Sequence, residues 1–316
     1  MRGYIIRRLL LLVPTAILAV TIIFFAMHIV PGDVILSRIE MGTSLRPEQL
    51  AEMRKSLGLD KPLVVQYTDW LWNAVRGDLG NSLATGRPVT DTLRRAIPVS
   101  LELAILSQVI ALSVAIPIGV ISAVRQDTIW DYVLRVFSIG MLATPSFWLA
   151  TMAIVLGAYW FYWAPPFGYI PFWQDPVSNL KQFLLPAFLM GLHGSAVAMR
   201  MTRSAVLEVL RQDYIRTAHA KGLSPRRILV VHVLKNALIP VVTLWGVTIA
   251  HLLAGTVIIE NIFALPGVGQ SMLNAINSRD IIQLQVNILF FGSAVVIVNL
   301  LVDLSYSVLD PRVRYN

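Results

Sequence analysis

Long apolar runs alternate with polar segments along this chain of 316 residues. A membrane-spanning helix needs roughly 20 consecutive apolar residues, so the pattern predicts about six spans. The expected spans are 9–30, 99–124, 133–156, 183–199, 239–259 and 286–304. The third of them carries Pro145 near its middle, and a proline there removes one backbone hydrogen bond. We therefore expect this span to be a single kinked helix.

The composition supports a membrane protein built from helices. Hydrophobic residues make up 56% of the chain and charged residues 14%, against about a quarter in soluble domains. Cysteine is absent, which excludes disulfides and thiolate metal sites. In a soluble protein the net charge of +8 would suggest nucleic acid, but among membrane spans the position of each charge matters more. The expected fold is an all-α membrane protein in a lipid bilayer, with no nucleic-acid partner.

The first apolar run is expected to remain as a membrane helix. It is longer than the roughly 7–15 apolar residues of a secretory signal peptide, and VPGD after it has the pattern of a turn. A long polar stretch follows, with helical patterns at 46–62 and 66–75. We therefore divide the chain into three parts. They are the N-terminal segment with the first span (1–30), a long extracytoplasmic segment (31–97) and a core transmembrane domain (98–316).

Basic residues set the expected orientation of the spans. Most Arg and Lys residues fall at the ends that alternate spans place in the cytoplasm, whereas the two later outer loops hold little beyond Arg279 and Lys181. The segment 31–97 is also basic, but long translocated segments largely escape the positive-inside rule. Both termini are therefore expected in the cytoplasm.

A basic segment between the fourth and fifth expected spans has the pattern of two short helices joined by a tight turn. Asp213 is a suitable N-cap for a helix over 214–221, and Gly222 stands where a left-handed residue would end that helix. Ser224 offers a second N-cap, and Pro225 fits the first position of the next helix. The segment is either a docking element for a partner or an ordinary basic cytoplasmic loop.

An uncharged stretch at 159–173 is dense in aromatic residues and prolines. Amphipathic rings settle at the membrane–water interface, which is the interpretation that the pattern favours. A stacking platform for sugars or bases is the alternative.

No catalytic motif stands out in the sequence. GxxxxGK[ST], HExxH and GxSxG are all absent, so no phosphate-binding loop, zinc-protease helix or nucleophile elbow is suggested. His193 and His251 fall at membrane depth, where an ionisable residue is a functional candidate but can also simply bond across a helix interface. Glu260 and Asp303 lie near span ends and are interpreted as structural. A pore-forming subunit driven by another protein fits best, and an ion-coupled secondary transporter or a membrane enzyme are the alternatives.

The stretch DYIRTAHAKG at 213–222 resembles the EAA coupling loop of permease subunits from ATP-binding-cassette (ABC) importers. The pattern of that loop is Glu-Ala-Ala, three residues, then Gly. Ala218 and Gly222 match it outright, whereas Arg216 and Thr217 take the places of Glu and the first Ala. The resemblance implies that 211–236 is a coupling loop that binds an ATPase. The residues expected to serve this coupling are Asp213, Tyr214, Arg216, Thr217, Ala218, Lys221 and Gly222.

Over nearly its whole length the chain is similar to the B-type permease of the dipeptide/oligopeptide/nickel ABC importer family. The matching pieces are RRLLLLVP (7–14), VPGD (30–33), LGLDKPLVVQY (57–67), RGDLGNSLATGRPV (76–89), TPSFWLA (144–150), DYIRTAHAKGLSPRRI (213–228), NALIP (236–240), FALPGVG (263–269) and VDLSYSVLDPRVRY (302–315). Where the family usually has Arg-Asp-Tyr-Pro, this chain has Arg-Asp-Ile-Ile at 279–282. The resemblance implies the type I ABC importer permease fold.

The resemblance also implies a division of labour in a bacterial inner membrane. This chain would form half of a translocation pathway with a second, homologous permease subunit. Two cytoplasmic ABC ATPase subunits would bind ATP and Mg, with no cofactor or metal on this chain, and an extracytoplasmic solute-binding protein would deliver the cargo. Peptides are the commonest cargo of the family, with nickel chelates, glutathione and oligosaccharides as alternatives. The candidate residues of the pathway are Thr144, Pro145, His193, Thr248 and His251.

Overall fold

The computed structural model describes residues 2–29, 55 and 60–309. In that part of the chain every regular element is a helix, apart from one isolated bridge between Asn81 and Pro88. The helices are α1 (Arg2–Ile29), α4 (Leu63–Val75), α5 (Val89–Val124), α6 (Ile129–Ala143), α7 (Ser146–Phe161), α8 (Pro176–Leu210), α9 (Asp213–Ala220), α10 (Pro225–Arg227), the π-helix η1 (Ile228–Val233), α11 (Leu234–Ile262), α12 (Val268–Asn277) and α13 (Ile281–Leu309). The all-α fold class is confirmed, whereas most of the helix expected over 46–62 lies outside the described residues.

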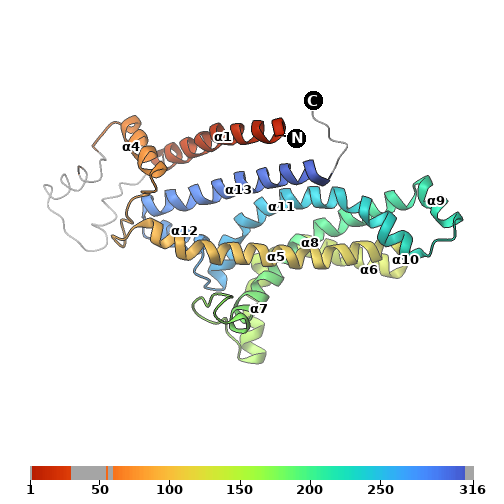
Figure 1. Cartoon of the computed structure of the whole chain (residues 1–316). Coiled ribbons are helices and arrows are strands. Elements are labelled where there is room, and N and C mark those ends of the chain that lie inside the picture. The colour runs from red at the N-terminus through yellow and green to blue at the C-terminus, as the bar shows by residue number, and fades with distance from the viewer. Residues whose placement is uncertain (1, 30–54, 56–59, 310–316) are drawn as a thin grey trace.

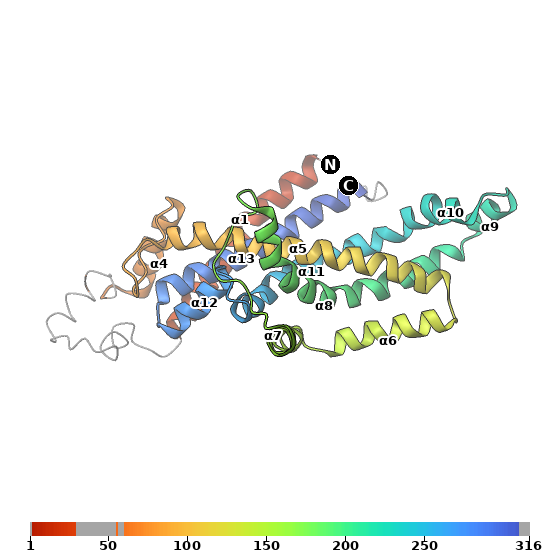
Figure 2. The same cartoon turned by 90° about the horizontal axis from the view of Figure 1, so that it is seen from below.

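The long helices run along one direction and form an elongated bundle (Figures 1 and 2). Helix α12 and the start of α5 lie at one end of the bundle, and α9 and α10 lie at the other (Figure 1). Helix α1 packs beside α13, and Phe24 of α1 touches Tyr67 and Trp70 of α4 through its ring.

Helices α5 and α8 make the most extensive contact in the molecule. On α5 the facing residues are small and recur every fourth position, so they share one helix face. They are the buried residues Ser107, Ala111, Ala115 and Gly119. Gly191 of α8 lies so close to them that an added Cβ would stand 2.6 Å from the backbone oxygen of Ser107. Small side chains thus let the two backbones approach closely, as is common between membrane helices.

The third expected span is not one kinked helix. Helices α6 and α7 meet at an angle of 94° around Thr144 and Pro145. Thr144 takes an extended conformation, with φ −93° and ψ 121°. A residue before proline is pushed out of the helical region by the proline ring, so the helix ends there and a new one starts at Ser146. The prediction of a kink at Pro145 located the break correctly but underestimated it.

The helices at the α12 end extend further than expected. Helix α5 starts at Val89, well before the predicted span, because Val89 and Leu93 are buried against Val268 and Val286. The division of the chain at residue 97 therefore falls inside α5. The connection between the expected spans 239–259 and 286–304, one of the two later outer loops expected from the sequence, contains α12 in its middle.

Several helices are long enough to cross a bilayer. Among the described residues, α5, α8 and α13 are both long and apolar enough, and the α6–α7 pair adds a fourth if it counts as one span. Helices α1 and α11 have 28 and 29 residues, above the roughly 20 that a crossing needs. The expectation of about six spans stays a prediction that these lengths allow, as does the cytoplasmic position of both termini.

The aromatic stretch 159–173 covers the end of α7 and the connection to α8. Tyr162 ends α7 in a left-handed conformation with φ 51°. Most of its large rings point outward, notably Tyr159, Trp160, Phe161, Tyr162, Phe167 and Trp173. Exposed rings of this kind agree with a position at the membrane–water interface, which stays a prediction.

Candidate functional site

Helix α9 is a short, sharply ended rod at one end of the bundle. Gln212 is its N-cap and Asp213 its first residue, so the expectation that Asp213 caps the helix was wrong by one position. At the other end Gly222 has φ +75°, and its N–H donates to the backbone oxygen of His219. The N–H of Leu223 donates to the backbone oxygen of Ala218, which completes a Schellman motif. The predicted left-handed stop at Gly222 is confirmed.

One face of α9 packs on the bundle. Ile215 and Ala218 are 1% and 7% exposed, and they lie in a hydrophobic cluster with residues from four other elements. Those residues are Ala123 of α5, Ala205 and Val206 of α8, Ile228 and Val233 of η1 and Ala237 of α11. Ala218, one of the expected coupling residues, therefore faces the bundle. The rod packs against η1 and shares this cluster with α5, α8 and α11.

The opposite face of α9 is open. Asp213, Tyr214, Arg216 and Thr217 are exposed, and so are Lys221 and Gly222 beyond the last turn. The hydroxyl of Thr217 donates to the backbone oxygen of Asp213 at 3.0 Å, within the same helix, and the other contacts are longer. The guanidinium of Arg216 stands 3.5 Å from the carboxylate of Asp213, and Asn236 donates to the hydroxyl of Tyr214 at 3.2 Å. This charged, hydrogen-bonding surface is free to meet a partner.

The helix after the turn runs into α11 without a break. Ser224 and Pro225 hold the N-cap and first helical position, as the sequence predicted. The backbone then widens into the π-helix η1 before α11 starts at Leu234. π-helical segments are rare and often mark functional positions, so η1 adds to the features of this end of the bundle. No sequence pattern indicated it.

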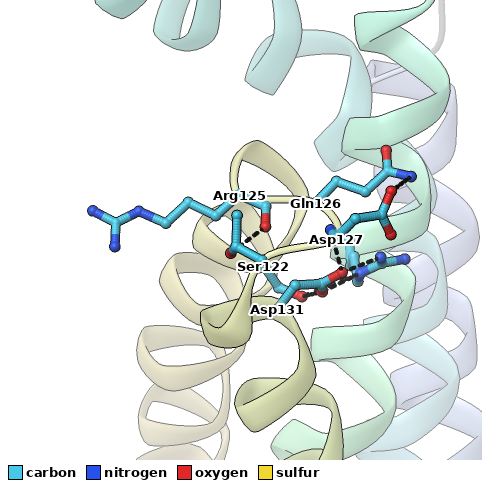
Figure 3. A network of polar contacts seen from close by, with 7 residues as sticks. Ser122, Arg125, Gln126, Asp127 and Asp131 are labelled. Atoms are coloured by element: carbon cyan, nitrogen blue, oxygen red, sulfur yellow. Dashed lines mark hydrogen bonds and ion pairs between the residues drawn. The ribbon is translucent and has the colours of Figure 1, made fainter.

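A buried ion pair stands beside this region and joins α6 to α8 (Figure 3). Arg203 of α8 donates through Nε and Nη2 to the two carboxylate oxygens of Asp131, at 2.8 and 2.7 Å. Asp131 is fully buried and also accepts from the hydroxyl of Ser122 and the backbone N–H of Asp127. The carboxylate thus ties the α5–α6 turn and both flanking helices to α8. Bidentate pairs of this kind fix geometry as well as charge.

Three of the candidate pathway residues come together at the α6–α7 break. Nδ1 of His193 lies 3.2 Å from the backbone oxygens of both Met141 and Thr144, at the end of α6 and next to Pro145. Carbonyls at a helix end lack intrahelical partners, so His193 supplies one. Thr248 is half-buried in α11, and the side chain of His251 lies outside the described part. The contact gives His193 a structural role and leaves the pathway assignment a prediction.

A cavity of about 670 Å³ opens at the other end of the bundle. Its walls come from the start of α5, from α12, and from the connections before α5 and α8. Tyr169 on its wall donates from its hydroxyl to Glu102 of α5 at 3.0 Å. Burial first, and then this hydrogen bond, raises the pKa of Tyr169 to about 12, so its proton stays in place at physiological pH. Asp280, also on the wall, accepts from Ser82 and from two backbone N–H groups.

Glu260 fixes the position of α12 beside this cavity. Its carboxylate accepts from the backbone N–H groups of Gly269 and Gln270, at 2.8 and 3.1 Å, and from the hydroxyl of Ser100 at 2.7 Å. Those N–H groups belong to the first turn of α12, where a negative charge is favoured. Glu260 is fully buried, so its interpretation as a structural residue fits the geometry.

Replacing Glu260 with glutamine is expected to loosen α12. Glutamine has nearly the same shape as glutamate, but its NH2 group replaces one acceptor oxygen. That NH2 group would face N–H or O–H donors and could not accept from them. An unsatisfied buried group costs about 1–3 kcal/mol. Trypsin digestion of the membrane-embedded chain should therefore cut faster at Arg279, just after α12, while a Glu208→Gln control on α8 should not change the cleavage rate. Equal rates in all three proteins would contradict the role given to Glu260.

Comparison with known families identifies the chain. Residues 1–104 match the model described as the N-terminal part of binding-protein-dependent transport system membrane components, and residues 115–315 match the inner membrane component of the same systems. The chain belongs to this permease family. The inner-membrane permease assignment made from the sequence is thereby confirmed, and the helices described above are those of such a subunit.

Several curated relatives match the whole permease. A transport system permease protein of Brucella abortus (strain 2308) is 39% identical over 316 residues and covers 100% of both chains. The dipeptide transport system permease protein DppB of Escherichia coli (strain K12) is 36% identical over 340 residues, covering 100% of this chain and 99% of its own. The di/tripeptide transport system permease protein DppB of Pseudomonas aeruginosa is 37% identical over 337 residues, with the same coverage.

A solved structure supports the fold of the permease. The methionine ABC transporter MetNI, in an inward-facing conformation, matches with a TM-score of 0.56 at 15% identity. The match covers 70% of this chain and 97% of the MetNI chain. At this identity it shows the fold alone, and the expected type I ABC importer permease fold is confirmed.

Sequence reasoning found α9 and its turn but missed the residues that hold the permease together. In the sequence, Asp131 follows the second expected span and Arg203 follows the fourth. No motif links the two residues. Glu260 was noted only as a residue near a span end, and α12 was hidden within a predicted loop. The one available signal was ALPGVGQS, in which a Pro-Gly turn precedes a run suited to a helix.

Proposed function

We propose that this permease forms half of the translocation pathway of an ATP-driven peptide importer, and that α9 receives the motion of an ATPase. The observation that carries the proposal is the seating of α9. It is held by a buried cluster on one face and exposes polar and charged side chains on the other. A rod anchored in this way transmits a push to the helices beneath it.

The cluster under α9 couples that rod to the spans. Ile215 and Ala218 share one buried cluster with residues of α5, α8 and α11. The Asp131–Arg203 pair then joins α8 to α6. A displacement of α9 is therefore passed to four long helices at once. Two packings of these helices, one opened to each side, would form a two-state element that nucleotide binding on the ATPase biases.

The proposed cargo is a small peptide. The Escherichia coli and Pseudomonas aeruginosa relatives carry the names dipeptide and di/tripeptide permease, and both align over the whole chain. Full-length similarity at 36% and 37% identity supports the same cargo class here. Nickel chelates, glutathione and oligosaccharides are the cargoes to test against peptides.

The proposed assembly places four further chains, of three kinds, around this one. A second, homologous permease completes the pathway, and two cytoplasmic ABC ATPases bring ATP and Mg. A solute-binding protein delivers the peptide on the extracytoplasmic side. In this arrangement the α9 end faces the cytoplasm and the α12 end faces outward, in agreement with the distribution of basic residues.

Replacing Gly222 with valine is expected to lower peptide uptake by about tenfold or more. A β-branched residue resists a positive φ, at a cost of roughly 1–3 kcal/mol, so the turn after α9 would open. An added Cβ at Gly222 meets no atom within 4 Å, so the effect comes from the backbone and not from a clash. Uptake of a labelled dipeptide into proteoliposomes that hold the complete assembly measures it.

The matched control is Gly222→Asn. Asparagine tolerates the left-handed region better than most other non-glycine residues, so uptake should stay near the wild-type rate. Both variants should reach the membrane in normal amounts, because the turn is exposed. Wild-type uptake by Gly222→Val would contradict the coupling role. Uptake that continues after ATP is depleted, with a proton gradient intact, would favour an ion-coupled transporter instead.

A further inference from the structure

The cavity at the α12 end has the size and the walls of a ligand site. Its volume of about 670 Å³ falls within the roughly 300–1,000 Å³ of pockets that bind small molecules. Helix α12 contributes Gln270 and Asn274, whose side-chain amides can donate and accept hydrogen bonds. Trp173 contributes an exposed aromatic ring. The cavity therefore offers neutral polar groups and one large apolar surface.

Two arginines give the cavity its charge. Arg94 and Arg95 of α5 both line it and are exposed. Neither side chain makes a hydrogen bond or ion pair with any residue in the part of the chain that the structure describes. The carboxylate on the same wall, Asp280, is only 2% exposed and is already engaged by Ser82. Two guanidinium groups that line a polar cavity thus have no partner among the described residues.

The walls are held in place independently of any ligand. Asp280 caps α13 through the N–H of Gln283 and also holds the connection before α5 through Ser82 and the N–H of Ala84. Glu260 fixes the start of α12. A site whose frame is fixed in this way loses little freedom when a ligand enters.

We propose that Arg94 and Arg95 bind the C-terminal carboxylate of the peptide as it enters the permease. Guanidinium groups bind carboxylates through parallel hydrogen bonds in a planar fork, which a lysine cannot reproduce. The amides of Gln270 and Asn274 would meet the peptide backbone on the opposite wall. This proposal rests on the proposed peptide import and adds a substrate contact to it.

The first test separates the carboxylate contact from the preference of the solute-binding protein. The complete assembly is reconstituted with ATPases and saturating binding protein, and uptake of Ala-Ala is compared with that of Ala-Ala amide. Arg94→Gln and Arg95→Gln should each lower uptake of the free acid by about tenfold, near the lower end of the range for a hydrogen bond to a charged group. Uptake of the amide should be unchanged. The same binding protein is used with every variant, so its own preference cancels in the ratio of variant to wild-type uptake for each peptide.

Arg87→Gln is the matched control. Arg87 lies in the connection before α5 and is exposed, but it does not line the cavity. It should leave uptake of both peptides at the wild-type rate. An equal loss in Arg87→Gln, or an equal loss of acid and amide uptake in the cavity variants, would overturn the site. Failure of the wild-type assembly to import any peptide would instead overturn the proposed function.

A second measurement tests ligand binding at Arg94 and Arg95 without transport. Phenylglyoxal modifies accessible arginines, and mass spectrometry reports the extent at each residue of the intact assembly in dodecyl maltoside, which carries no phosphate. Ala-Ala should protect Arg94 and Arg95, whereas Ala-Ala amide should not, and Arg87 should react equally in both. The same labelling is done in phosphatidylglycerol vesicles. Protection of the two arginines that occurs only in these vesicles, with or without peptide, would overturn the proposal in favour of a lipid phosphate.

Discussion

Replacing Asp131 with alanine is expected to destabilise the permease by about 3 kcal/mol. Loss of one partner of a buried ion pair typically costs roughly 3–5 kcal/mol, because the other charge stays behind without compensation. Asp131 is fully buried, whereas the side chain of Arg203 is 21% exposed. Water can therefore reach part of the stranded guanidinium, which places the cost at the lower end of that range. The hydroxyl of Ser122 and the N–H of Asp127 would lose their acceptor as well.

Thermal unfolding of the purified permease in detergent measures this effect. The double variant Asp131→Ala with Arg203→Ala should recover part of the loss, because it removes the unpaired cation. Asp69→Asn is the control, since Asp69 pairs with Lys61 at the surface and both side chains are about half exposed. Exposed pairs contribute only about 0–1 kcal/mol. A shift for Asp131→Ala no larger than that of the control would contradict the importance given to the buried pair.

Local sequence signals predicted the parts of the site that are local in structure. Gly222 was identified as a left-handed stop from its type and position, and Ser224 with Pro225 identified the next helix start. The error at Asp213 was small, because Gln212 takes the N-cap place without using its side chain. These features depend on the backbone preferences of single residues, which the sequence displays directly.

The contacts that link distant helices could not be predicted in this way. Asp131 and Arg203 are 72 positions apart, and Glu260 and Ser100 are 160 apart. Periodicity places a residue on a helix face but does not tell which helix it meets. The extension of α5 back to Val89 has the same origin, since it depends on contacts with Val268 and Val286. The 94° bend also exceeds what one proline predicts, because it depends on where α7 packs.

The fold joins two sites of different character. At the α9 end an exposed rod is clamped to the bundle by apolar contacts and a buried ion pair. At the α12 end a polar cavity is framed by buried carboxylates. Helix α5 runs between them, with Arg94 and Arg95 near its start and Ala123 near its end. A joint movement of the closely packed α5 and α8 is therefore the simplest way for one end to affect the other.

Replacing Gly191 with alanine is expected to destabilise the permease by about 1–3 kcal/mol, the usual cost of overpacking a closely packed core. The new Cβ would lie 2.6 Å from the backbone oxygen of Ser107 and 3.2 Å from the backbone nitrogen of Ala111. Backbone atoms cannot rotate away as a side chain can, so α5 and α8 would have to separate. Gly119→Ala should behave alike, since its Cβ would lie 2.7 Å from the backbone oxygen of Met199. Larger residues at either position should prevent accumulation of folded protein.

Gly140→Ala provides the matched control, because it makes the same chemical change within a helix. A Cβ at Gly140 meets no atom within 4 Å. Alanine is favoured over glycine in helices by roughly 0.5–1 kcal/mol, so this variant should keep or slightly gain stability. The melting temperatures of the three purified variants in one detergent therefore separate close helix packing from helix propensity. Equal melting temperatures for Gly191→Ala and Gly140→Ala would show that α5 and α8 can part without cost, and the proposed transmission between the two ends would lose its rigid element.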